Sequence, residues 1–188
     1  MAFYIPLEKT SVILIALGSN RSGVWGPPAR TVKTAMDVLA KTAGTQILWR
    51  SDLYETAGVG PGQPGVFVNA VVAIECHCSP DALLRRLKAI ERMAGPRSAR
   101  RWGPRTLDLD ILDYRGRIIG WRKSDRLSDA ALRNGIVLPH ALMHSRPFVL
   151  APLAEAMPEW RHPVLKSTAR ELWKRVRDAR TGQVLKRV

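Results

Sequence analysis

Two aspartates at alternate positions of a strand-like stretch place the strongest constraint on how this chain folds. Asp108 and Asp110 alternate with three apolar residues, Leu107, Leu109 and Ile111. Successive side chains of a strand point to opposite faces, so the apolar residues share one face and the two carboxylates share the other. The stretch therefore predicts a strand that is buried on one side and presents a pair of carboxylates on the other.

The carboxylate face is suited to divalent cations that also bind an anion. In an extended strand Asp108 and Asp110 lie about 7 Å apart, and such a pair can hold one or two hard cations. Several arginines lie just before the two aspartates in the sequence. We expect Arg101 and Arg105 to bind phosphates and Arg100 only to be solvated. The alternative is a solvated strand face with no ligand. The sequence has no glycine-rich phosphate loop, so arginines and metal would have to hold a nucleotide.

Apolar runs and helical spacings predict the order of the elements. Strands are expected where apolar and β-branched residues run together, at 12–17, 47–54, 66–74 and 106–114. Helices are expected where apolar residues recur at helical spacing, at 32–43 and 79–94. The second helix has clear ends, with Ser79 as N-cap, Pro80 in the first turn and Gly95 at the stop.

This βαββαβ order predicts an α+β fold, the ferredoxin-like sandwich, with helices on one face of an antiparallel sheet. We expect residues 1–188 to form a single domain, with the ferredoxin-like core at about 12–120 and a C-terminal helical part at about 136–180. Ser167 is the expected cap of the last helix, and the residues from 180 onward are expected to fray.

Charge and cysteine content limit the class of protein. The net charge of +14 is concentrated in two segments, 85–105 and 161–188, and this surplus attracts phosphates, nucleic acid included. No apolar run is long enough to span a bilayer. Cys76 and Cys78 lie too close in sequence for an ordinary disulfide, so we expect a reducing, cytoplasmic setting. Zinc binding at Cys76-His77-Cys78 is disfavoured because no second pair of ligands follows.

Asn69 lies within an apolar strand, where an amide is costly unless it is hydrogen-bonded. It could face a heterocycle, because its side chain offers both a donor and an acceptor, or it could make a structural bond. Two other functions stay open on these residues. One is an RNA-binding ferredoxin-like module with basic loops, although the third strand lacks an aromatic stacking pattern. The other is a phosphohydrolase that uses the same pair of aspartates.

Several motifs together resemble a known family. The longest is Arg101-Trp102-Gly103-Pro104-Arg105-Thr106-Leu107-Asp108-Leu109-Asp110-Ile111, and others in the same order are Ala16-Leu17-Gly18-Ser19-Asn20, Tyr54-Glu55-Thr56, Phe67-Val68-Asn69-Ala70, Pro139-His140 and Arg146-Pro147-Phe148. The chain is similar, over roughly 12–163, to 6-hydroxymethyl-7,8-dihydropterin pyrophosphokinase, an enzyme of folate synthesis. The resemblance implies transfer of pyrophosphate from ATP to the pterin hydroxymethyl group, with release of AMP.

The resemblance also implies roles for individual residues. Two magnesium ions would be bound by Asp108 and Asp110, which with Arg105 form the catalytic set. The nucleotide would be contacted by Arg97, Arg101, Trp102, Arg105, Ile111, His140 and Arg146. The pterin would be contacted by Gly18, Thr56, Val59, Phe67, Asn69 and Phe148. ATP and the hydroxymethyl-dihydropterin are then the expected partners of a monomer or weak dimer, with no membrane and no nucleic acid involved.

The chain also departs from the family pattern. The basic loop between Glu91 and Trp102 is one residue shorter than the family pattern and keeps a single arginine, Arg97, of its usual pair. Residues 121–135 form an insertion of about a dozen residues near the expected place of the adenine or ribose. Ala141 replaces a bulkier side chain after His140, and the extension from Ser167 has no assigned role.

Overall fold

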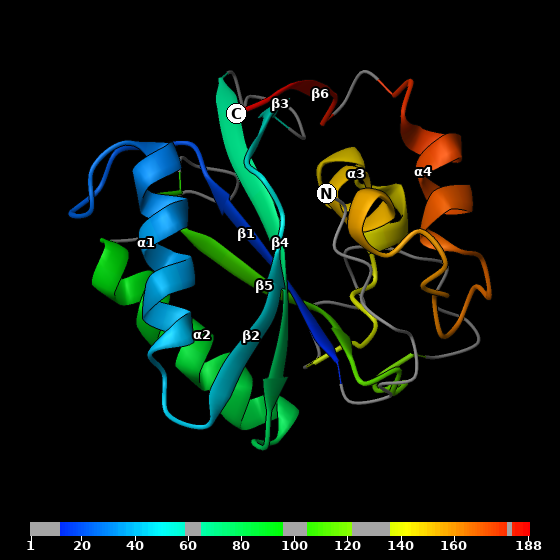
Figure 1. Cartoon of the computed structure of the whole chain (residues 1–188), viewed down its shortest axis with the longest axis horizontal. Coiled ribbons are helices and arrows are strands. Elements are labelled where there is room, and N and C mark those ends of the chain that lie inside the picture. The colour runs from blue at the N-terminus through cyan, green and yellow to red at the C-terminus, as the bar shows by residue number, and fades with distance from the viewer. Residues whose placement is uncertain (1–11, 59–64, 96–104, 122–135, 180–181) are drawn as a thin grey trace.

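One antiparallel sheet lies between two layers of helices (Figure 1). This computed structural model describes residues 12–58, 65–95, 105–121, 136–179 and 182–188. The strands are β1 (Ile13–Ser19), β2 (Thr45–Arg50), β3 (Tyr54–Ala57), β4 (Val66–Cys76), β5 (Asp108–Tyr114) and β6 (Val184–Arg187). Their order is β5-β1-β4-β3-β6, and β2 pairs with another part of β4. The long β4 and its neighbour β1 therefore form the centre of the sheet.

The helices divide between the two faces, as Figure 1 shows. They are α1 (Pro28–Ala40), α2 (Pro80–Ala94), α3 (Pro147–Ala156) and α4 (Ala169–Val176), with a short 3-10 helix η2 (Met143–Ser145) before α3. One buried cluster lies between the sheet and α1 with α2, and a second lies under α3 and α4. Among the helices of the described residues, none is both long and apolar enough to cross a membrane.

The ferredoxin-like prediction is confirmed, with one addition. If β2 and β3 are taken as one interrupted strand, β1 to β5 with α1 and α2 follow the expected βαββαβ order. The expected helices cover one face. The second face is also covered, because α3 and α4 pack on it. The α2 boundaries are as predicted: the Ser79 hydroxyl accepts from the Ala82 amide at 3.3 Å, and Gly95 ends the helix.

The expected second strand, 47–54, is wrong as a continuous element. It is broken at Ser51, whose hydroxyl accepts from the Val71 amide at 3.0 Å while its own amide donates to the Val71 carbonyl at 2.9 Å. The serine side chain thus takes a place in the hydrogen-bond ladder that a backbone group would otherwise fill. β2 and β3 continue separately on either side of this interruption, and both pair with β4.

Three expectations at chain ends and turns are also wrong. The end of the chain is a strand, β6, because its backbone pairs with β3. The cap of α4 is Thr168, which forms a capping box with Glu171, and lies one residue after the expected Ser167. Cys76 and Cys78 form a disulfide. The chain turns after β4, so their Cα atoms are 5.6 Å apart, within the range that a bridge can span.

Candidate active site

The register of the sheet brings Asn69, Gly18 and Asp108 into one row. Asn69 pairs with Gly18 across β4 and β1, and Gly18 pairs with Asp108 across β1 and β5. Directly paired residues project to the same face of a sheet. That face is the one covered by α3, because Ala16, two residues before Gly18, belongs to the cluster under α3. Asn69 and Asp108 are thus about 10 Å apart, two strand spacings.

The aspartate pair lies on the α3 face as the sequence predicted. Leu107, Leu109 and Ile111 are buried in the cluster on the opposite face, so their alternation with the aspartates is confirmed. The side chains of Asp108 and Asp110 keep exposed fractions of 23% and 31%. The two carboxylates can therefore be reached by a ligand from the α3 side.

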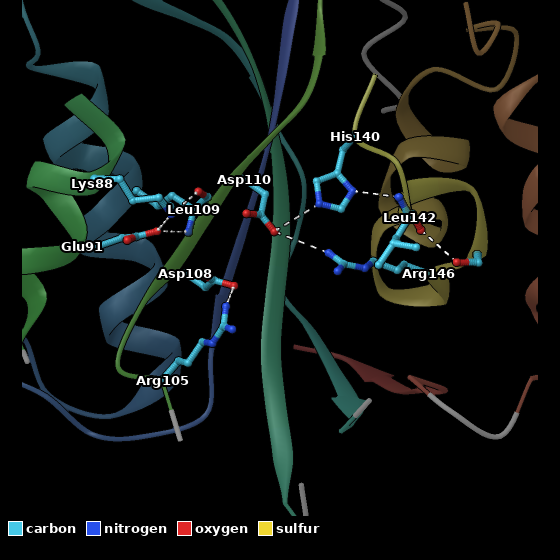
Figure 2. A network of polar contacts seen from close by, with 10 residues as sticks. Lys88, Glu91, Arg105, Asp108, Leu109, Asp110, His140, Leu142 and Arg146 are labelled. Atoms are coloured by element: carbon cyan, nitrogen blue, oxygen red, sulfur yellow. Dashed lines mark hydrogen bonds and ion pairs between the residues drawn. The ribbon is translucent and has the colours of Figure 1, made fainter. Parts of the chain in front are cut away.

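Three cationic or polar side chains converge on these carboxylates from different elements (Figure 2). Arg105, just before β5, forms an ion pair with Asp108. Arg146, the residue before α3, places Nη1 3.5 Å from Asp110 Oδ2, and His140 places Nε2 4.0 Å from the same oxygen. The structure therefore brings together five of the residues that the sequence assigned to metal and phosphate.

The surroundings of the two carboxylates have opposite effects on their pKa values. Burial, and then the Asp110 carboxylate, raise the pKa of Asp108. Burial would also raise the pKa of Asp110, but His140 and Arg146 outweigh it and hold the pKa below its usual value. Asp110 is thus the more firmly ionised of the two. A carboxylate that remains charged at neutral pH is a suitable ligand for a hard cation.

His140 is held neutral and in one tautomer. Burial lowers the pKa of His140 to about 4. Its Nδ1 accepts from the Leu142 amide at 3.1 Å, so the ring proton is on Nε2, the atom that faces Asp110. His140 therefore presents an N–H donor to this part of the site.

Two side chains of α2 hold the backbone of β5 between the aspartates (Figure 2). Glu91 Oε1 accepts from the Leu109 amide at 2.8 Å, and Lys88 Nζ lies 2.5 Å from the same oxygen and 3.3 Å from the Leu109 carbonyl. Glu91 is only 2% exposed. The sequence analysis missed this role, although a signal existed: Glu91 falls within the buried stripe of its helix, where an acid needs partners.

The turn after β1 fixes the start of β5. The Asn20 side chain accepts from the Arg105 amide at 2.8 Å, and the Asn20 amide donates to the Arg105 carbonyl at 3.1 Å. The Ser19 hydroxyl donates to the Thr106 carbonyl at 2.5 Å. In the sequence this turn was notable only as one of the family motifs. In the structure it positions Arg105 beside the carboxylates.

The other end of the row is a polar pair in apolar surroundings. Asn69 Nδ2 donates to Thr56 Oγ1 at 2.7 Å, and both residues are buried. Phe67 pairs with Thr56 across β4 and β3, so it projects to the same face. Phe148 comes from α3, and the Arg146 guanidinium lies 5.7 Å from the centre of its ring. Asn69 thus makes a structural bond, and Phe67 lies two residues before it on the same face of β4.

The remaining predicted site residues have different positions. The Ile111 side chain is buried on the face opposite to the aspartates, so only its backbone can reach a ligand on the edge of β5. Val59, Arg97, Arg101 and Trp102 lie outside the described residues. Their roles stay predictions.

Comparison with known proteins identifies the family of this chain. The sequence model of 7,8-dihydro-6-hydroxymethylpterin-pyrophosphokinase matches residues 14–158. The chain belongs to this family. Its members include the 2-amino-4-hydroxy-6-hydroxymethyldihydropteridine pyrophosphokinases of Synechocystis and Haemophilus influenzae. The first is 37% identical over 150 residues, which are 80% of this chain and 68% of the relative. The second is 38% identical over 141 residues, which are 75% of this chain and 78% of the relative.

Solved structures agree in fold with this pyrophosphokinase family member. The crystal structure of wild-type Plasmodium falciparum HPPK-DHPS has a TM-score of 0.61 at 16% identity, covering 87% of this chain and 44% of that one. An HPPK-DHPS in complex with substrates has a TM-score of 0.64 at 14% identity, covering 87% and 43%. The chain thus spans less than half of those proteins, and at this identity the likeness shows the fold alone. The family match gives no support to the RNA-binding alternative.

Proposed function

We propose that this site moves the pyrophosphoryl group of ATP to the hydroxymethyl group of 6-hydroxymethyl-7,8-dihydropterin, giving AMP and the pterin diphosphate of folate synthesis. The observation that carries the proposal is the row of Asn69, Gly18 and Asp108 on the α3 face. One end of the row has a buried amide with Phe67 on the same sheet face, and the other has two carboxylates with arginines. These are the requirements of a heterocycle and of a polyphosphate, about 10 Å apart.

Asp108 and Asp110 would hold two magnesium ions. In the described residues no group of three or more acids, histidines or cysteines surrounds a metal position. A magnesium ion that bridges substrate phosphates needs only one or two protein carboxylates, so the pair fits it. When bound, the ions would neutralise the charge that develops on the transferred phosphates.

The phosphates would be bound by the cations beside the carboxylates. The Arg105 and Arg146 side chains enter from opposite sides, one from the start of β5 and one from the start of α3 (Figure 2). Guanidinium groups bind phosphate oxygens through paired N–H donors. His140 would add its Nε2–H as a neutral donor. We also assign Arg97, Arg101 and Trp102 to contacts that close over the nucleotide.

The adenine would lie along the outer edge of β5, which no other strand of the described residues covers. This strand is at the end of the sheet, and the Leu109 amide and carbonyl already bond to α2 side chains outside it. Backbone groups two residues apart project from the same edge of a strand. The Ile111 amide and carbonyl would therefore offer the adenine a donor and an acceptor.

The pterin would bind at the Asn69 end. Within the part of the chain that the structure describes, the Asn69 carbonyl oxygen and the Thr56 hydroxyl proton make no other hydrogen bond, so both would be offered to the ring. Phe67 and Phe148 would enclose the flat faces, and Gly18 lets the ring approach β1. Val59 is assigned to its edge.

In the reaction the hydroxymethyl oxygen forms a bond to the β-phosphorus and gives up its proton to water. The bond between the β-phosphorus and the bridging oxygen of the α-phosphate breaks, and AMP leaves with that electron pair. Binding both substrates on one rigid face of the sheet would provide most of the rate acceleration, because the attack requires in-line alignment. No nucleophilic side chain is needed. We place the reaction in the cytoplasm, where ATP is available, and expect a monomer or weak dimer.

The test is AMP release from ATP and the hydroxymethyl-dihydropterin in magnesium. The wild type should release AMP only when the pterin is present. Asp110→Asn should lower the rate at least about 100-fold. Asp37→Asn is the matched control, because Asp37 is an exposed ion-paired acid on α1, away from the site. Phosphate or pyrophosphate release without pterin would favour the phosphohydrolase and contradict the proposal.

A further inference from the structure

The last strand, β6, lies against the strand that carries Thr56. β6 covers the outer edge of β3, with Arg187 opposite Tyr54 and Val184 opposite Thr56 (Figure 1). The Ala57 amide donates to the Gln183 carbonyl at 2.9 Å, and the Val188 amide donates to the Leu53 carbonyl at 2.8 Å. β3 has only four residues, so β6 is one of the two strands that define its position. The family match ends at residue 158, before this strand.

One side chain of β6 connects two walls of the site. Arg187 Nη1 lies 2.6 Å from Glu155 Oε1 on α3, and Arg187 Nη2 pairs with Asp52 just before β3. The other oxygen of Glu155 accepts from the Tyr54 hydroxyl on β3. We call these four residues, Arg187, Asp52, Glu155 and Tyr54, the Arg187 network. It ties β3, which carries Thr56, to α3, which carries Phe148.

The geometry of the network directs its effect to the pterin end. Tyr54 is directly opposite Asn69 on β4 and two residues from Thr56, so all three side chains share the α3 face. The aspartates are on β5, at the other end of the sheet order. A shift of β3, with α3 held in place, would therefore change the separation of Thr56 and Phe148 and leave Asp108, Asp110 and Arg146 in their positions.

We propose that Arg187 is a positioning residue for pterin binding: it fixes β3 against α3 so that the Thr56–Asn69 pair and Phe148 enclose the ring. This inference rests on the proposed pterin site. It assigns a role to a segment that the family motifs do not reach.

The strength of these contacts predicts a moderate and selective loss of pterin affinity when the Arg187 network is broken. The Arg187 side chain is 58% exposed, and ion pairs between exposed side chains are individually weak. Tyr54 is buried, so its hydrogen bond to Glu155 is better shielded from water than the ion pairs of Arg187. Burial and then this hydrogen bond raise the pKa of Tyr54 above its ordinary value. A loss of the network should therefore weaken pterin binding about three- to tenfold without unfolding the protein.

The experiment compares Arg187→Met with Arg170→Met. Arg170 is a matched control, because it is 57% exposed and pairs with Glu159 at 3.0 Å, away from β3. Pterin affinity is measured by calorimetry with magnesium and a non-hydrolysable ATP analogue, and KM and kcat by AMP release. Arg187→Met should raise the pterin Kd and KM about two- to fivefold, with the ATP KM and kcat unchanged. Arg170→Met should change none of them.

A second arm separates positioning from general stability. Tyr54→Phe should raise the pterin Kd in the same direction, and its combination with Arg187→Met should be less than additive, because both act through Glu155. Arg187→Lys should restore part of the affinity. An unchanged pterin Kd, or equal losses for pterin and ATP, would overturn the positioning role. If the wild type bound no pterin and released no AMP, the proposed function itself would be wrong.

Discussion

Gly18 offers a direct test of the row that joins the two ends of the site. A Cβ atom added at Gly18 would lie 2.8 Å from Asn69 Oδ1, with Asn69 Cγ next at 4.0 Å. The Asn69 side-chain amide cannot move away from Gly18 without disturbing a hydrogen bond, because its Nδ2 donates to Thr56 Oγ1 at 2.7 Å on the side away from Gly18. Gly18→Ala should therefore rotate the amide and break or weaken this bond.

The magnitude follows from the two distances. A carbon and an oxygen that are not bonded approach to about 3.3 Å, so the amide oxygen must move by roughly 0.5 Å. A buried hydrogen bond contributes about 0.5 to 1.5 kcal/mol net. At about 1.4 kcal/mol per tenfold change, the pterin Kd should rise roughly two- to tenfold. The ATP Kd should not change, because Asp108, Arg105 and Arg146 are untouched.

Calorimetry of pterin and of the ATP analogue on wild type and variant measures both constants. Asn69→Ala and the double variant Gly18→Ala/Asn69→Ala complete a cycle. With no amide present, the added methyl group has nothing to displace, so Gly18→Ala should cost little in the Asn69→Ala background. If Gly18→Ala leaves pterin binding unchanged, or costs the same in both backgrounds, the contact between Gly18 and Asn69 does not shape the site.

Three further predictions concern other parts of the structure. Glu91→Ala leaves the Leu109 amide without its buried acceptor, and urea unfolding should show a loss of about 1–3 kcal/mol together with a higher magnesium requirement; unchanged values would contradict the role of Glu91. Arg146→Lys loses the paired donors of a guanidinium and should raise the ATP KM about tenfold with little change in the pterin KM. His162 is buried and its pKa is lowered from an ordinary 6.5 to about 4, so its contribution to stability is complete above pH 6.5 and is lost as the pH falls towards 4. As the pH falls, the unfolded chain binds the proton before the folded protein does, so this loss of unfolding free energy is about 2 kcal/mol at pH 5. Unfolding curves at pH 7 and pH 5 should show the loss for the wild type and not for His162→Gln.

Local signals in the sequence predicted local structure well. The period of two around Asp108 and Asp110 correctly separated the buried apolar face from the carboxylate face. The Ser79-Pro80 start and Gly95 end of α2 were also right. In each case the information lies within a few residues, because side-chain alternation and helix capping depend on neighbours in sequence.

Elements held by distant partners could not be predicted in this way. β6 is short and mostly exposed, and its ion pairs reach Asp52, Glu55 and Glu155, more than thirty residues away. The break at Ser51 depends on a hydrogen bond to Val71. The role of Glu91 depends on the Leu109 amide. Nothing in the sequence around these residues specifies the partner, so the patterns predicted frayed residues and one long strand, and they indicated no role for Glu91.

The site itself combines the two kinds of information. Motifs identified Asn69, Gly18 and Asp108 separately, but only the pairing of three strands brings them into one row. The side-chain period of a strand is two, so a slip of one residue in β1 would turn Gly18 to the other face and put Leu17 or Ser19 in the row. A bulky side chain there would separate the amide from the carboxylates. The separation of Asn69 from the carboxylates is therefore set by sheet register, and the buried faces of β1, β4 and β5 hold that register in place.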